Sequence, residues 1–302
     1  MRFRIRPKKA FTSEIRSIAE SQFDLAISLL KDRPDGLHEA IHDARRCFKR
    51  LRAVYRLIAS EAPDFQKREN VRIRDLSKSL SAVRDATSLI EACEYLRDYT
   101  HTPHDDGALT RIIRILQHRR SLIAADNTLL EAKTLAAVAV CDSARGAVHH
   151  LVLDDRPRHA AGTLAHGWRR SVQHARKAID ACEDGGDGDA LHELRKRSQD
   201  YWMYVQLLRS AWSSAMRSKQ ADIKRLVDVL GHSNDLTMLR TVIENEQKRF
   251  DDADDRETLL HAISVRQQAL REEALPQARL VFADDARQES RIVRQLWLLA
   301  HE

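Results

Sequence analysis

The chain has 302 residues, with 51 basic and 45 acidic side chains that leave a formal net charge of +6, and 43% of its residues are hydrophobic. It contains only 9 glycines and 6 prolines, and this scarcity, with abundant alanine, leucine, arginine and glutamate, predicts an all-α protein. No apolar leader and no run of about 20 apolar residues is present, so we expect no signal peptide, no membrane partner and a cytoplasmic location. The four cysteines form no C-x-x-C pair and are expected to be buried thiols.

The first half is predicted to consist of helices joined by short polar turns. Residues 34–36 (Pro-Asp-Gly) break the chain after the first helix, Asp85 marks a bend or tight connection, and residues 101–107 form a loop. A Thr/Ser cap at residues 12–13 is expected to open the first helix, with Glu14 in its first turn. The helices are expected over about 12–31, about 37–60, from about 64, after the Asp85 block, and over about 108–152.

The second half repeats this plan after a boundary at residues 156–158 (Arg-Pro-Arg). Polar turns are expected at residues 183–189 and 251–255, and no stretch shows the alternation of a β-strand. Helices are expected over about 160–181, from His192, over about 214–230, and after Asn234. Residues 10–155 and 156–302 are therefore predicted to be two antiparallel helical bundles within one unit spanning residues 1–302.

One basic pattern occurs twice at a fixed spacing. The sequence His42-Asp43-Ala44-Arg45-Arg46 recurs 150 residues later as His192-Glu193-Leu194-Arg195-Lys196. The blocks Leu76…Leu80…Asp85 and Leu226…Leu230…Asp235 keep the same offset without a gap. Two separated blocks in one register indicate an internal duplication. Two halves that each present a cationic helix suggest closure around one anionic ligand.

Residues 42–58 are predicted to form an amphipathic helix. The apolar side chains between Ala44 and Ile58 fall on about a third of the circumference, and basic side chains cover the opposite side. Asp43 is the only acid between His42 and Arg56. Because like charges at i,i+4 spacing repel each other, a bound polyanion would offset the cost of this face. The alternatives are a solvated face, or neutralisation by acids on neighbouring helices.

Two further basic stretches favour an anion-binding surface. Residues 169–177 contain no acid, and a group of arginines lies within residues 111–120. The second His helix is weaker, because Gln199, Asp200 and Trp202 occupy positions that are basic in the first. We therefore expect one asymmetric cationic cavity whose strongest wall is the first His helix.

The ordered set of motifs resembles the CHAD family of helical proteins, which is named for its histidines. It covers nearly the whole chain, from Phe3 to the last helix, although Val172 departs from a tyrosine that is frequent in the family. The resemblance rests on residues 42–52 and 191–197, residues 80–85 and 230–235, residues 167–177, and residues 279–283.

The resemblance implies two antiparallel four-helix bundles related by pseudo-twofold symmetry, with a basic cavity between them. It also implies non-catalytic binding of inorganic polyphosphate, association with polyphosphate granules, and no cofactor or metal. The triphosphate-tunnel domain that many relatives carry is absent from this sequence. The candidate polyphosphate-binding residues are His42, Arg45, Arg46, Lys49, Arg50, Arg52, Arg56, Arg119, Arg120, Arg169, Arg170, Arg176, Lys177, His192, Arg195 and Lys196.

Three other functions compete with this interpretation. A basic helical surface also attracts nucleic acid, and an exposed histidine on a helical bundle also suits phosphotransfer, although His42 has more cations around it than one phosphoryl group needs. A metal-dependent polyphosphate hydrolase would require carboxylates that hold metal ions. The acidic segments 184–189 and 251–255 are more typical of turns, and His38 and His42 lack a third ligand nearby in the sequence. His42 and His192 either contact phosphate or are structural.

Overall fold

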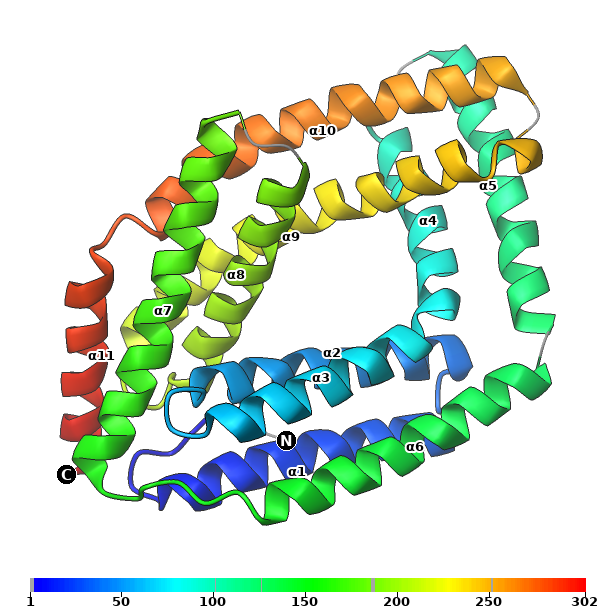
Figure 1. Ribbon diagram of the computed structural model, residues 1–302. Coiled ribbons are helices and arrows are strands. Elements are labelled where there is room, and N and C mark those ends of the chain that lie inside the picture. Colours follow the sequence, from blue (N-terminus) through cyan, green and yellow to red (C-terminus); the bar gives the residue numbers. More distant parts are fainter. Residues whose placement is uncertain (1–2, 101, 126, 186–187, 251) are drawn as a thin grey trace.

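The computed structural model describes residues 3–100, 102–125, 127–185, 188–250 and 252–302, without the side chains of residues 82–84, 124–125 and 127–129. Within these residues all regular structure is helical, which confirms the predicted all-α class (Figure 1). The expected loop at 101–107 and the expected turns at 183–189 and 251–255 lie partly outside the described residues.

Eleven α-helices and one 3-10 turn make up the described part of the chain. Those of the first half are α1 (Phe11–Asp32), α2 (Leu37–Leu57), α3 (Pro63–Ser79), α4 (Ser81–Arg97), α5 (Pro103–Ala125) and α6 (Asn127–His149). Those of the second half are α7 (Pro157–Glu183), α8 (Gly188–Leu207), α9 (Ser213–Asn245), η1 (Gln247–Arg249), α10 (Ala253–Val281) and α11 (Ala286–His301).

The helix starts keep the spacing of the sequence repeat. α3 and α9 begin 150 residues apart, at Pro63 and Ser213, and α5 and α10 begin 150 residues apart, at Pro103 and Ala253. This is the register that a duplicated unit would produce, and it pairs each position on α5 with one position on α10.

The two halves differ at the middle of this repeat. In the first half the helix is interrupted at Leu80, not at the expected Asp85, which lies inside α4. In the second half the expected helix end at Leu230 is wrong, because α9 continues through this residue. Ser79 Oγ donates to the Leu76 carbonyl at 2.8 Å, but Ser21 Oγ donates to the Ile18 carbonyl in the same way inside the unbroken α1, so this bond alone does not end α3.

The start of α1 is held by a distant segment. The predicted Thr/Ser cap is wrong, because Ala10 occupies the N-cap position and no side chain of this end caps it. Instead the backbone N–H of Thr12 donates to Asp155 Oδ1 at 2.7 Å, and Thr12 Oγ1 donates to the Leu153 carbonyl at 2.9 Å. The connection between α6 and α7 therefore fixes the first helix.

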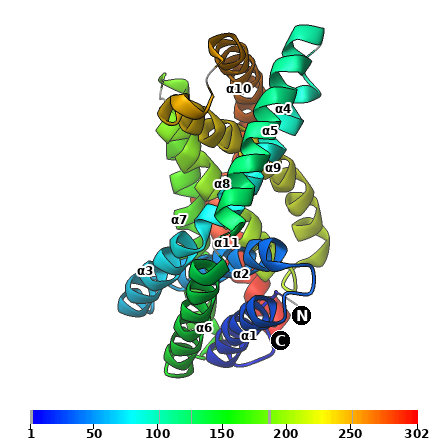
Figure 2. The ribbon, with the colours of Figure 1, turned by 90° about the vertical axis from the view of Figure 1, so that its right-hand side faces the viewer.

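The packing crosses the midpoint of the sequence. α1, α2, α3 and α6 pack together at one end of the molecule, and α7 packs with α8 and α11 (Figures 1 and 2). α4 and α5 pack against α9 and α10 of the second half, so the first half does not close on itself as one bundle. The break at Leu80 redirects the chain, and the apolar side chains Leu89 and Leu96 of α4 are buried in this arrangement.

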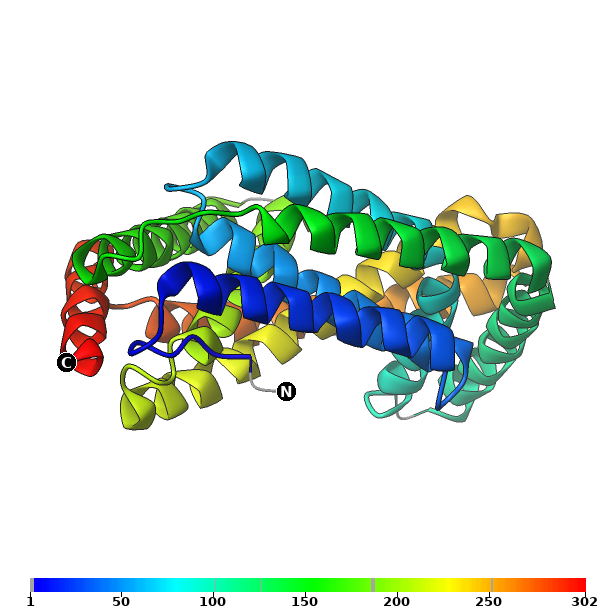
Figure 3. The same cartoon turned by 90° about the horizontal axis from the view of Figure 1, so that it is seen from below.

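The junction of the two halves is apolar and tightly packed. Within the first half, α1 and α6 lie side by side when the molecule is seen from below (Figure 3). Phe11 of α1 meets Trp297 of α11 edge to face across this junction, with ring centroids 6.4 Å apart. Within the second half, the ring centroids of Trp168 and Tyr201 lie 4.8 Å apart. The four cysteines are buried free thiols, as expected. No described helix is both long and apolar enough to cross a bilayer.

Candidate anion-binding site

The first His helix, α2, has the predicted amphipathic face. Ala44, Cys47, Phe48, Leu51 and Val54 are all buried. The basic side chains on the rest of the helix are half-buried or exposed. These basic side chains lie in different environments along the helix, and the environment of each decides whether it could contact a ligand.

Two arginines near the end of α2 share an acceptor on α3, and one of them also reaches the second half of the chain. Arg52 Nε donates to Asn70 Oδ1 of α3 at 2.9 Å, and Arg56 Nη1 lies 3.3 Å from the same oxygen. Arg56 also forms an ion pair with Asp200 of α8, whose side chain is only 7% exposed. This ion pair joins the two halves at the position where the sequence had suggested a lost cation.

A small pocket of about 130 Å³ opens beside this ion pair, between α2, α3, α7 and α8. We call it the junction pocket. Its walls are Arg56, Ala59, Gln66, Gly167, Arg170, Ser171, His174, Arg197, Asp200 and Tyr204.

Positive charge is crowded around the junction pocket. The pKa of Arg52 is lowered to about 10, first by burial and then by the nearby charges of Arg56 and Arg74. Burial also lowers the pKa of His174, and Arg197 and Arg170 lower it further. Both shifts show that these groups lie in an environment that disfavours further positive charge.

Several polar atoms at this junction are buried without a hydrogen-bond partner among the described residues. They include Nε of Arg56, Nε of Arg169 and Oγ of Ser171. A buried donor without an acceptor is costly. The junction therefore combines unused donors with excess positive charge, a combination that suits an anion.

A second, larger cavity of about 790 Å³ lies between α8, α9 and α10 and contains the second His motif. His192 Nδ1 lies 3.1 Å from Asn234 Oδ1. Burial lowers the pKa of Arg195, against the opposing effect of Asp235, and the buried Nε of Arg195 has no described partner. Arg240 and Arg271 also line this cavity, which we call the α8–α10 cavity.

The start of α2 presents the other residues of the first His motif. His42 is half-buried and Lys49 is exposed. Arg45 Nη1 donates to the Ser77 carbonyl of α3 at 2.6 Å, and Arg46 Nη1 lies 3.1 Å from Asp43 Oδ1. Neither cavity described above includes these four side chains in its walls.

The remaining candidates lie apart from both cavities. Arg50 reaches Gln22 of α1, Arg119 forms two hydrogen bonds with Glu246, and Lys196 pairs with Glu193. Arg120 lowers the pKa of His38, after burial, so it lies near the start of α2.

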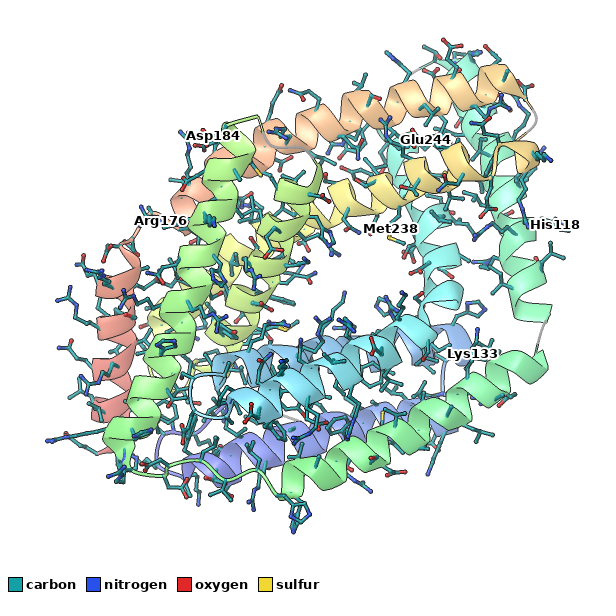
Figure 4. The ribbon with its side chains drawn as sticks, in the orientation of Figure 1. His118, Lys133, Arg176, Asp184, Met238 and Glu244 are labelled. Atoms are coloured by element: carbon teal, nitrogen blue, oxygen red, sulfur yellow. The ribbon has the colours of Figure 1, made fainter. Side chains whose placement is uncertain are left out.

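Two more basic residues of α7 are exposed. Arg176 projects from α7 on the side of the α10–α11 connection (Figure 4), and its charge contributes to lowering the pKa of Asp285 there. Lys177 is also exposed and contributes to lowering the pKa of His174. The structure thus distributes the candidate set over several places along the basic helices.

Sequence reasoning missed His174, Arg197 and Arg74. His174 could have been found, because it follows Arg170 by four residues and so shares its helix face. Arg197 belongs to the second His motif but was not selected. Arg74 gave no signal, since its role depends on how α3 packs against α2.

The described part of the second acidic segment, residues 252–255, is accounted for by helix structure. Asp252 caps α10 by accepting from the backbone N–H groups of Asp254 and Asp255. Asp255 binds Arg111, and Asp254 lies 3.0 Å from His104 Nε2. The carboxylates of the three described residues lie within 4.8 Å of one another, and each has one of these structural contacts.

The structure therefore defines an all-helical protein with a cationic pocket where its two halves meet. The CHAD domain family matches residues 21–244, and the chain belongs to this family. The crystal structure of the CHAD domain from the plant Ricinus communis has a similar fold, with a TM-score of 0.64 over 93% of this chain and 94% of that chain at 16% identity. At this identity the likeness shows the fold alone. No protein of curated function matches the chain.

Proposed function

We propose that this protein binds inorganic polyphosphate without catalysing a reaction, and that the junction pocket is the centre of the binding surface. Membership of the CHAD family supports the ligand. The observation that carries the site is the gathering of Arg56, Arg170, Arg197 and His174 around one acid, Asp200, whose charge Arg56 already neutralises. Through the same ligand, the protein would associate with polyphosphate granules.

Electrostatics favour such a ligand. Each internal phosphate of a polyphosphate chain carries about one negative charge, so binding should release counterions much as nucleic-acid binding does. Arginine side chains suit phosphate oxygens because the guanidinium donates in a planar fork. An anion beside Arg52 and His174 would also remove the like-charge repulsion that lowers their pKa values.

The size of the junction pocket limits what it can hold. Its 130 Å³ is well below the roughly 300–1,000 Å³ of ordinary small-ligand pockets. A long polyphosphate chain would therefore insert only a short segment there. The rest would run over exposed cations such as Lys177 and along α2 toward its basic start.

A binding role fits the junction pocket better than hydrolysis. Metal-assisted phosphoryl hydrolysis normally needs several carboxylates to hold the metal ions. Among the described residues that line the pocket, Asp200 is the acidic one, and it is paired with Arg56 and lies 3.8 Å from Arg197 Nη1. Phosphate release from polyphosphate in the presence of magnesium or manganese would contradict a purely binding role.

The central test is a calorimetric titration with long-chain polyphosphate at physiological salt, with duplex DNA, RNA and ATP as competitors. We expect polyphosphate to bind and nucleic acid to compete poorly. The double variant Arg170→Gln/Arg197→Gln should lose about tenfold or more in affinity, since charged hydrogen bonds are worth about 1.5–3 kcal/mol each.

Two comparison variants sharpen this titration. The triple variant Arg45→Ala/Arg46→Ala/Lys49→Ala measures the contribution of the first His helix, which we expect to be large as well. Arg145→Gln removes an exposed arginine of α6 that pairs with Asp24, and it should bind as the unmodified protein does. Retained helicity is checked by circular dichroism. Stronger binding of duplex DNA than of polyphosphate would overturn the proposal.

A further inference from the structure

A third cavity, unrelated to the basic helices, lies where the α4–α5 connection meets α10. Its volume is about 770 Å³. Three carboxylates line it, from Asp105, Asp254 and Glu257, beside the exposed ring of Tyr99. The remaining lining residues are Leu96, Thr100, Thr102, Thr258, His261, Ala262, Val265, Arg266 and Ala269. We call it the α5–α10 cavity.

The same helix pair already holds two forked guanidinium–carboxylate pairs close to this cavity. There, two arginines of α5 reach carboxylates near the start of α10 and the end of α9. Arg111 binds Asp255 through Nε at 2.7 Å and Nη2 at 2.5 Å, and Arg119 binds Glu246 at 3.1 and 2.8 Å. Each carboxylate thus receives a forked guanidinium group.

The repeat register assigns the corresponding positions in the α5–α10 cavity. Because α5 and α10 begin 150 residues apart, His261 corresponds to Arg111 and Ala269 to Arg119. The carboxylate that corresponds to Asp255 is retained as Asp105, whereas Leu96 corresponds to Glu246. Asp105 is therefore a carboxylate that lacks, at the corresponding position, the arginine that its counterpart Asp255 binds.

The cations that do line the cavity are few and partly engaged. Arg266 donates to the Tyr95 hydroxyl through Nε at 2.7 Å, and its guanidinium carbon lies 3.6 Å from the centroid of the Tyr99 ring. Asp254 lies 3.0 Å from His104 Nε2. Among the described residues, the carboxylates of Asp105 and Glu257 have no hydrogen bond or ion pair. Negative charge therefore exceeds positive charge in this cavity.

We propose that the α5–α10 cavity binds a small aliphatic cation that carries a guanidinium group. The guanidinium group would lie against Asp105, as that of Arg111 lies against the corresponding Asp255. Its aliphatic chain would pack on Leu96, Val265 and Ala269, which supply an apolar wall. This site is independent of polyphosphate binding, because no residue of the cavity belongs to the proposed polyphosphate surface.

The test uses agmatine, a four-carbon chain with guanidinium and amino ends, titrated calorimetrically into the full chain without polyphosphate. We expect saturable binding that weakens at least tenfold in Asp105→Asn. His261→Arg places an internal guanidinium group opposite Asp105, and it should abolish agmatine binding while the melting temperature stays equal or rises. Asp106→Asn is the matched control, because Asp106 pairs with Arg97 and does not line the cavity.

Three results would overturn this proposal. One is the absence of saturable binding at millimolar agmatine. Another is unchanged affinity in both Asp105→Asn and His261→Arg, with circular dichroism showing that both variants fold. The third is equal affinity for putrescine, the diamine with the same four-carbon chain, because it would show that the guanidinium group is not recognised. Since polyphosphate is left out, failure of the proposed function would leave this measurement unaffected.

Discussion

His174 lies in surroundings in the junction pocket that disfavour its protonated form. Burial lowers its pKa, and Arg197 and Arg170 lower it further. The folded protein therefore binds fewer protons at this site than an unfolded chain, whose histidine titrates near pH 6.5. It follows that His174 reduces folding stability as the pH falls below about 6.5. A phosphate group placed beside the imidazole would act in the opposite direction and raise the pKa of His174.

This opposition predicts that polyphosphate binding takes up a proton. We expect affinity to increase as the pH is lowered from 8 toward 6, and to level off below the pKa of His174 in the free protein. In His174→Gln the pH dependence should become shallower. His166→Gln, an exposed histidine on the same helix outside the pocket, should retain it. Titrations at a series of pH values measure the effect, and equal slopes in the two variants would contradict it.

At the scale of elements, the crossing of α7 over α2 sets the width of the junction pocket. A Cβ atom on Gly167 would lie 2.3 Å from the Leu57 carbonyl oxygen and 2.9 Å from Leu57 Cδ1. The first of these is a backbone atom at the end of α2, so it cannot move aside as the tip of a side chain could. The small residue therefore permits the close contact that brings Arg56 and Arg170 to one pocket.

We therefore expect Gly167→Ala to destabilise the protein by about 1–3 kcal/mol, since it overpacks a tight helix contact. Gly162→Ala is the control on the same helix, because nothing lies within 4 Å of its added Cβ. It should stabilise the protein by about 0.5–1 kcal/mol, because alanine favours the helical backbone. Urea unfolding measures both variants. A neutral Gly167→Ala would show that α7 and α2 can separate without cost.

The sequence predicted the helices well, and its failures share one physical cause. The apolar stripe of α2 and the proline and glycine breaks are local signals, and they located most elements. By contrast, α9 continues through Leu230 while packed against α8 and α10, and the cap of α1 comes from Asp155, more than 140 residues away. Neither can be found from a window of neighbouring residues.

The same limit applies to the candidate site. A helical wheel shows that Arg56 lies on the polar side of α2, but not that Asp200 of α8 faces it. It also cannot show that Arg119 is already neutralised by Glu246. The sequence therefore located the basic helix faces, whereas which of their side chains form internal ion pairs could be learned only from the packing of α7 and α8 on α2.

At the scale of the whole molecule, the net charge of +6 is spread over the chain, whereas the junction pocket gathers Arg56, Arg170 and Arg197 around one acid, Asp200. If polyphosphate binds there, its affinity must depend on salt, because each neutralised phosphate releases a counterion. We expect the logarithm of the association constant to fall linearly with the logarithm of the salt concentration. The slope should be about 0.7 for each phosphate contacted.

Arg170→Gln should lower this slope by about 0.7, since it removes one phosphate contact. Arg145→Gln, which removes an equally exposed charge from α6, should leave the slope unchanged even though the net charge falls by the same amount. The pair of variants thus separates local contact from the long-range field, because a field effect depends on total charge and would alter both slopes alike. Titrations at several salt concentrations decide between them, and a common change in slope would place polyphosphate over the whole basic surface rather than at the junction pocket.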